Sequence, residues 1–164
     1  MWPPPQLARA LYDWALRARR AVGGRAVRPE AIHLTLAFLG EVPAERLSAA
    51  LRAAQRVRFA RHALPIEEAR CWAHRGIVWA GPRTTPPETA TLVERLRLAL
   101  AAEGFALEPR PFVAHVTLLR KAKRSAELPT LEPLAWTVTE FVLARSRLSA
   151  AGASYETLAR FSAA

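Results

Sequence analysis

Residues 28–40 read RPEAIHLTLAFLG, and their side chains alternate strictly from Ile32 to Leu39. Successive side chains of an extended strand point to opposite faces, so this alternation predicts a strand that stops at Gly40. One face of that strand carries Ile32, Leu34, Leu36 and Phe38, and the other carries His33, Thr35, Ala37 and Leu39. His33 and Thr35 would therefore lie side by side, about 7 Å apart along the strand.

The tetrapeptide His33-Leu34-Thr35-Leu36 has a counterpart in His115-Val116-Thr117-Leu118. Residues 112–120 alternate in the same way, which predicts a second strand with an imidazole, a hydroxyl and Leu119 on one face. We expect a chain built from two such units to bring the strands together about a pseudo-twofold axis. The alternative is a pair of unrelated strand histidines, each satisfied by local hydrogen bonds.

The rest of the chain interleaves helices and strands through short connections. Apolar spacing predicts helices over 6–20, 44–57 and 88–103, and strands over 64–72, 76–80, 135–138, 140–148 and 154–161. The last two strands form a hairpin with its turn around 151–152. Frequent hairpins and short connections favour a mainly antiparallel α+β fold over a doubly wound parallel sheet.

Charge and cysteine content narrow the class of protein. The chain has 24 basic and 14 acidic residues, a formal net charge of +10, which fits a polyanionic partner such as RNA; a solvated arginine-rich surface is the alternative. Cys71 is the only cysteine, so neither an internal disulfide nor a cysteine metal cage can form, and we expect a buried, inert thiol. No apolar run is long enough to span a membrane and residues 1–5 do not resemble a signal peptide, so we expect a cytoplasmic protein.

Paired histidines suit the cleavage of a phosphodiester. The attacking oxygen needs a base and the departing oxygen needs an acid, and imidazole can serve either role near neutral pH. His33 and His115 are therefore the candidate catalytic residues. Thr35 and Thr117 could hydrogen-bond the other phosphate oxygens, and Arg120, at the end of the second strand, could meet their charge. An ordinary surface arginine is the alternative for Arg120.

At these motifs the chain resembles the RNA 2′,3′-cyclic phosphodiesterases, also called 2′-5′ RNA ligases, of the two-histidine phosphoesterase superfamily. The resemblance rests on residues 28–40, on Arg110-Pro111-Phe112 leading into 115–121, and on the tail segments 140–143 and 155–158. It implies an α+β fold in which residues 1–164 form a single bilobal domain, with two pseudo-symmetric lobes of mainly antiparallel sheet and outer helices around a central groove. It also implies opening of an RNA 2′,3′-cyclic phosphate to a 2′-phosphomonoester, without a metal or nucleotide cofactor. RNA ends, tRNA fragments among them, are the implied partners.

The same resemblance implies residue roles. His33 would be the general acid for the leaving 3′ oxygen and His115 the general base for water, and these roles would exchange in the ligation direction. Thr35 and Thr117 would hold phosphate. Family members usually begin with a short strand that ends near the position of Met1-Trp2-Pro3, so we expect that strand to be absent here. Its absence would leave a strand edge open to association with another chain. The oligomeric state is therefore undecided.

The remaining aromatic and histidine residues are open to two interpretations. Phe38 is a candidate base contact, because aromatic rings stack on single-stranded RNA bases, although its alternation favours core packing; the same choice applies to the tryptophans of the predicted hairpin. We expect structural roles for Trp2, Trp14 and Trp136. His62 and His74 are expected on the surface or in turns, and the roles of Trp72 and Trp79 stay open.

Two other functions compete with the leading hypothesis. A non-catalytic RNA-binding module would use the same basic groove. A two-histidine phosphoesterase could also act on another cyclic nucleotide or on a 2′-5′ linkage, because substrate choice lies in loops that alternation does not place.

Overall fold

A computed structural model describes residues 1–123, 126–149 and 152–164. Its three helices of two turns or more are α1 (Pro5–Val22), α2 (Leu47–Gln55) and α3 (Pro87–Ala102). Its short helical turns are η1 (Pro29–Ala31), η2 (Ala44–Arg46) and η3 (Ala73–Arg75). Its strands are β1 (Arg25–Ala26), β2 (His62–Ala63), β3 (Glu68–Trp72), β4 (Ile77–Gly81), β5 (Val116–Arg120), β6 (Thr137–Val138), β7 (Glu140–Ser149) and β8 (Gly152–Ser162).

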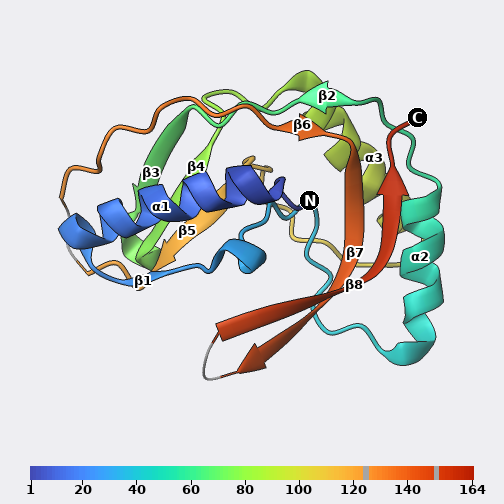
Figure 1. Cartoon of the computed structure of the whole chain (residues 1–164). Coiled ribbons are helices and arrows are strands. Elements are labelled where there is room, and N and C mark those ends of the chain that lie inside the picture. Colours follow the sequence, from blue (N-terminus) through green and yellow to red (C-terminus); the bar gives the residue numbers. More distant parts are fainter. Residues whose placement is uncertain (124–125, 150–151) are drawn as a thin grey trace.

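A four-stranded antiparallel sheet forms one half of the molecule, in the order β1-β5-β4-β3. Helix α1 crosses this sheet (Figure 1) and buries Leu11, Trp14 and Ala18 against it. Proline in its first turn suits a helix start, because that position has no hydrogen bond to lose. The helix ends at Gly23, whose positive φ closes the last turn.

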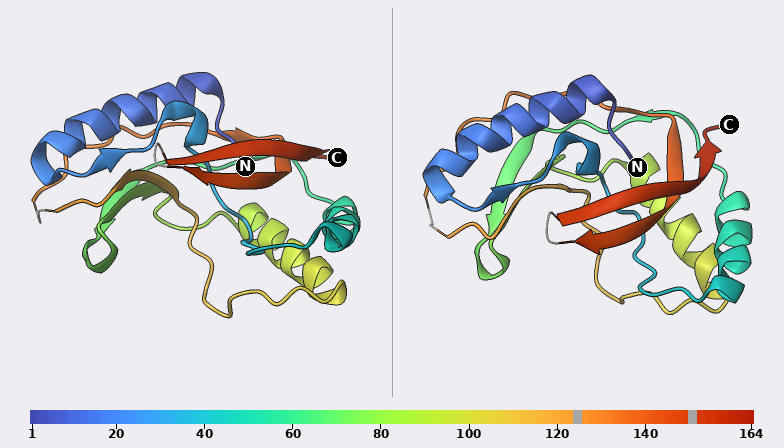
Figure 2. Two further views of the ribbon diagram at one scale, coloured as in Figure 1. Left: turned by 90° about the horizontal axis from the view of Figure 1, so that it is seen from below. Right: turned by 60° about the horizontal axis from the view of Figure 1, so that its bottom comes forward.

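The other half combines two short ladders with two helices. Strands β2 and β6 pair, and the pairing continues through a bridge between Ile66 and Leu134. Strands β7 and β8 form a long hairpin that extends well beyond the helices α2 and α3 at its side (Figures 1 and 2). Buried side chains from both halves join one core, so the sheet and the hairpin are held by shared packing.

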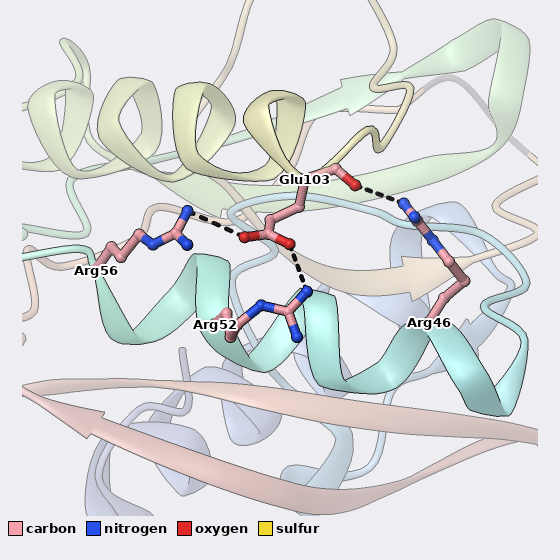
Figure 3. A network of polar contacts seen from close by, with 4 residues as sticks. All are labelled: Arg46, Arg52, Arg56 and Glu103. Carbon is pink, nitrogen blue, oxygen red and sulfur yellow. Dashed lines mark hydrogen bonds and ion pairs between the residues drawn. The ribbon is translucent and has the colours of Figure 1, made fainter.

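Glu103 joins helix α2 to the end of α3 (Figure 3). Its carboxylate accepts from Arg52 at 2.8 Å and lies 3.0 Å from Arg56, while Arg46 donates to its backbone carbonyl at 2.6 Å. The Arg52 hydrogen bond and the charges of Arg52 and Arg56 lower the pKa of the Glu103 carboxyl. We call these four residues the Glu103 clasp.

The predicted α+β class with antiparallel sheets is confirmed, and the three predicted helices and the terminal hairpin are found within a few residues of their expected bounds. The predicted turn of that hairpin falls partly on residues 150–151, outside the described residues. The organisation of residues 1–164 as a single bilobal domain stays a prediction.

The predicted strand over 32–39 is wrong as a continuous strand. Only Leu34 pairs with the sheet, through a bridge to Val116. The turn η1 interrupts the pairing with β5 that begins in β1. After this turn, the chain pairs with β5 only at Leu34. The second predicted strand is shorter than expected and begins at Val116 rather than at Phe112.

Two side chains lie elsewhere than expected. Cys71 is exposed rather than buried, because β3 is an edge strand of its sheet. His62 is buried instead of lying at the surface, and its ring nitrogens contact the Thr89 hydroxyl and the Ala60 carbonyl at 2.9 Å each. His74 lies exposed in η3, as predicted.

Candidate active site

The bridge between Leu34 and Val116 brings the two repeated motifs together. The bridge is antiparallel, so the residues on either side of it are also opposed: His33 faces Thr117, and Thr35 faces His115. Leu34 and Val116 are almost fully buried. The four motif side chains therefore share the opposite, accessible face.

This pairing places the two imidazoles on one diagonal of a rectangle and the two hydroxyls on the other. Directly opposed residues in an antiparallel pair are about 4.5–5.5 Å apart at Cβ, and diagonal neighbours about 7–8 Å. The twofold axis expected from the repeat passes through the Leu34–Val116 pair. The two imidazoles are close enough that, besides burial, the charge of His115 lowers the pKa of His33.

Each imidazole is held by the same backbone contact. Nδ1 of His33 lies 2.8 Å from the Ala31 carbonyl oxygen, and Nδ1 of His115 lies 2.7 Å from the Val113 carbonyl oxygen. A carbonyl can only accept, so Nδ1 carries the hydrogen in both rings. Nε2 is then the nitrogen that gains or loses a proton, in either histidine.

Burial lowers the pKa of both histidines. The hydrogen bonds that the rings donate to the carbonyls of Ala31 and Val113 act against this shift, whereas the positive charge of Arg120 adds to it at both rings. Arg110 adds to the shift at His115 as well. Both imidazoles are therefore biased toward the neutral form in the free protein, and a bound phosphate anion would favour their charged form.

Aromatic rings border both histidines. Around His33, the ring centroid of Trp2 is 5.1 Å away and that of Tyr155 is 4.6 Å away. Around His115, the corresponding rings are Trp72 at 4.8 Å and Trp79 at 6.1 Å. These rings exclude water from one side of each imidazole, which is the physical origin of the burial that lowers both pKa values.

Sequence reasoning missed part of this aromatic border. Trp14 and Trp136 are buried, as predicted. Trp2, which is also predicted to be structural, contacts His33, and no sequence pattern indicated that contact. Tyr155 was not singled out at all. The only available signal was its place in the tail segment that resembles the family, because β8 and the motif strand are far apart in the sequence.

A β-bulge directs Arg120 toward the site. The β4–β5 register pairs Val78 with Leu119 but Trp79 with Thr117, so Leu118 is the extra residue on β5. Strict alternation would put Leu119 on the face of His115 and Arg120 on the buried face. The bulge reverses this: Leu119 is fully buried, and Arg120 is exposed on the histidine face.

A cavity of about 1040 Å³ is lined by the first motif, residues 33–36. Its lining includes His33, Thr35, Phe38 and Arg120, together with the hairpin residue Tyr155. His115 and Thr117 are not part of this lining, so the cavity lies on the side of the site that His33 and Thr35 occupy.

Phe38 does not pack in the core as its alternation suggested. It is 66% exposed and lies on the cavity wall. Leu36 is the last buried residue of the alternating run, because the chain leaves the sheet after the single bridge at Leu34. An exposed ring beside a basic cavity is available to a planar ligand.

Metal-binding residues do not gather at this site. Among the described residues, no group of three or more His, Cys, Asp or Glu side chains is arranged to hold a metal ion. No helix in the same part of the chain is long and apolar enough to cross a membrane.

Comparisons with known proteins identify relatives that match most of this chain. A family model for LigT-like phosphoesterases matches residues 1–79. The RNA 2′,3′-cyclic phosphodiesterase of Escherichia coli is 34% identical over 160 residues, which cover 96% of this chain and 90% of that protein. The protein of the same name from Thermus thermophilus is 34% identical over 175 residues, covering 97% and 85%.

Solved structures show the same relationship. E. coli LigT complexed with 3′-AMP matches with a TM-score of 0.87 and 32% identity, over 98% of this chain and 93% of that chain. A crystal structure described as a phosphoesterase matches with a TM-score of 0.89 and 33% identity, over 99% and 94%. The chain belongs to the LigT-like phosphoesterase family.

Proposed function

We propose that this protein hydrolyses the 2′,3′-cyclic phosphate at RNA ends to a 2′-phosphomonoester, with His33 and His115 as its acid and base. The observation that carries this proposal is the diagonal placement of two imidazoles around the Leu34–Val116 bridge. The relatives named RNA 2′,3′-cyclic phosphodiesterase support the choice of reaction. RNA, tRNA fragments included, is the proposed partner, and the cytoplasm the proposed location.

In the proposed reaction, His115 Nε2 takes a proton from water as the water oxygen attacks phosphorus. The bond between phosphorus and the 3′ oxygen breaks, and His33 Nε2 gives its proton to that oxygen. Attack and departure must lie on opposite sides of phosphorus, which groups on a diagonal can serve. A 5′-hydroxyl in place of water would yield a 2′-5′ linkage, so ligation is a second reaction open to the same site.

Hydrogen-bond donors meet the remaining phosphate oxygens in this proposal. The hydroxyls of Thr35 and Thr117 lie on the other diagonal, and the guanidinium of Arg120 lies on the same face. Donors aimed at developing charge in a partly dry site are a large source of rate acceleration. Phe38, exposed on the cavity wall, is placed to stack on the terminal base.

The test uses an RNA with a 2′,3′-cyclic end, in the presence of EDTA. The expected product is a 2′-phosphate, and His33→Ala and His115→Ala should each lower kcat by about 10²–10⁴-fold, the usual contribution of one acid or base group. His62→Ala is a poor control because that ring is buried; His74→Ala, which alters an exposed histidine, should leave kcat unchanged.

Retained turnover in either active-site variant would overturn the mechanism. Binding of RNA without turnover, unaffected by both substitutions, would instead favour a non-catalytic RNA-binding module. Turnover of a nucleoside cyclic phosphate or a 2′-5′ linkage in preference to RNA cyclic ends would keep the mechanism and change the substrate.

A further inference from the structure

Two arginines stand directly opposite each other at the end of the central sheet. Arg25 of β1 and Arg120 of β5 are partners in the antiparallel register. Like charges in directly opposed positions destabilise a strand pair. Neither guanidinium lies within ion-pair distance of a carboxylate among the described residues, whereas Arg52, Arg70 and Arg160 each have a glutamate partner.

The backbone around this pair is packed closely. A Cβ added to Gly24, which has a φ of +89°, would lie only 2.7 Å from the Arg120 carbonyl oxygen. Glycine at this position therefore allows β1 to approach the end of β5. The apposition of Arg25 and Arg120 is built into the fold rather than being a chance meeting of long side chains.

The register also determines the face on which Arg25 lies. Directly opposed residues share a face of the sheet, so Arg25 lies on the face of Arg120, Thr117 and His115. Its guanidinium reaches the distal end of the β7–β8 hairpin, 3.5 Å from the position that a Cβ on Gly152 would occupy. The Arg25 side chain therefore lies between the sheet and the hairpin. Arg120 lines the cavity, and Arg25 lies outside its lining.

Electrostatics at this position favour an anion. Two exposed guanidinium groups on one face of the sheet, with no carboxylate partner in the described part of the chain, make this face attractive to an anion. Planar guanidinium groups bind phosphate oxygens through two parallel hydrogen bonds. Arg120 is assigned to the reacting phosphate, which leaves Arg25 for a phosphate farther along the same ligand.

We infer that Arg25 binds the internucleotide phosphate next to the cyclic end of an RNA chain. The substrate class is then an oligonucleotide rather than a free nucleoside cyclic phosphate. This inference rests on the proposed function, because Arg120 must first hold the reacting phosphate. Arg25 itself does not touch the reacting atoms, so it acts in substrate selection.

The experiment compares three substrates: a nucleoside 2′,3′-cyclic phosphate, a dinucleotide with the same cyclic end, and that dinucleotide with an uncharged methylphosphonate linkage. The wild-type protein should prefer the charged dinucleotide over both others by about 10-fold in kcat/KM, as one hydrogen-bonded charge pair implies. In Arg25→Gln this preference should fall to near one, through a loss confined to the charged dinucleotide. Arg25→Lys should keep part of it.

Arg17→Gln is the matched control, because Arg17 is an exposed arginine on α1, and it should retain the full preference. An equal loss on all three substrates in Arg25→Gln, or no loss on the charged dinucleotide, overturns the inference. Thermal unfolding of Arg25→Gln should show no loss of stability, since the substitution removes a like-charge contact.

Failure of the proposed function can be told apart from failure of this inference. If the wild-type protein turns over none of the three substrates, the proposed function fails. Calorimetric binding of the 2′-phosphorylated dinucleotide and of its methylphosphonate counterpart then decides the role of Arg25. Equal affinity of the wild-type protein for the two ligands would overturn it.

Discussion

Both candidate catalytic histidines donate from Nδ1 to the carbonyl two residues earlier. His62 makes the same contact with the Ala60 carbonyl, so the contact reflects the reach of a ring to a carbonyl two residues earlier rather than the repeated motif. The contact leaves Nε2 as the working nitrogen of each ring. Proton transfer can therefore begin from either histidine, and their surroundings must decide which is acid and which is base.

The pH dependence of catalysis should be displaced toward acid. Burial and the charge of Arg120 lower both histidine pKa values from the ordinary 6.5. The base must be neutral and the acid protonated, so both limbs of the kcat/KM profile, which reports the free protein, should lie below pH 6.5. Arg120→Gln removes one cause of lowering, and both limbs should then move up in pH.

Measurement of kcat/KM between pH 4 and 9 (a working range of roughly 5 units around the reference pKa) checks this expectation. Arg17→Gln serves again as the control and should leave both limbs in place. Limbs that do not move in Arg120→Gln would show that the arginine charge is screened from the imidazoles.

At the scale of elements, the bulge in β5 determines what the second motif can do. Without the extra residue Leu118, Arg120 would point into the core and Leu119 would face the site. The bulge arises from the pairing of β5 with β4, so it depends on a neighbour that is remote in sequence. The position of Arg120 near the strand end favours it as a phosphate-binding residue, whereas alternation alone places its side chain on the buried face with Val116 and Leu118.

The Glu103 clasp should contribute stability above a defined pH. The pKa of the Glu103 carboxyl is lowered in the folded protein from an ordinary value of 4.5, so the clasp is fully present above that value. Its contribution is lost as the pH falls through the lower, folded-state pKa, because the protonated carboxyl no longer pairs with Arg52 and Arg56.

Glu103→Gln should therefore lower the Tm at pH 7, and the difference from wild type should shrink as the pH falls below 4.5. Scanning calorimetry over this range measures it. Glu30→Gln, which alters a more exposed carboxylate paired only with Arg28, is the control and should change the Tm less. A Tm difference that is constant with pH would show that the clasp acts by packing alone.

At the scale of the whole molecule, the net charge of +10 has a consequence for binding. Added salt screens each contact between a guanidinium and a phosphate. If Arg120 and Arg25 each meet one phosphate, the affinity for a 2′-phosphorylated dinucleotide should fall more steeply with salt than the affinity for a nucleoside 2′-phosphate.

Calorimetric titration from low to moderate salt gives both slopes. The slope for the dinucleotide should return to that of the mononucleotide in Arg25→Gln. Equal slopes in the wild-type protein would mean that the second phosphate is not neutralised, and that the general charge contributes only to long-range attraction.

The sequence by itself determined the parts of this site that depend on a local period. The alternation around each histidine predicts that His33 and Thr35 share one face, and that His115 and Thr117 share another. The duplicated motif predicts that the two segments lie side by side. The helices and the terminal hairpin were also predictable, since their apolar spacing and turn residues are near neighbours along the chain.

Only the tertiary structure decided the rest, because those features depend on contacts between segments remote in sequence. The partner strand β4 introduces the bulge that turns Arg120 outward, and the single bridge at Leu34 ends the pairing early enough to leave Phe38 exposed. Strand β8 brings Tyr155 to His33, and β1 brings Arg25 to Arg120. Alternation along one strand gives no information about which other strand pairs with it, or where a bulge or the end of pairing will break the alternation.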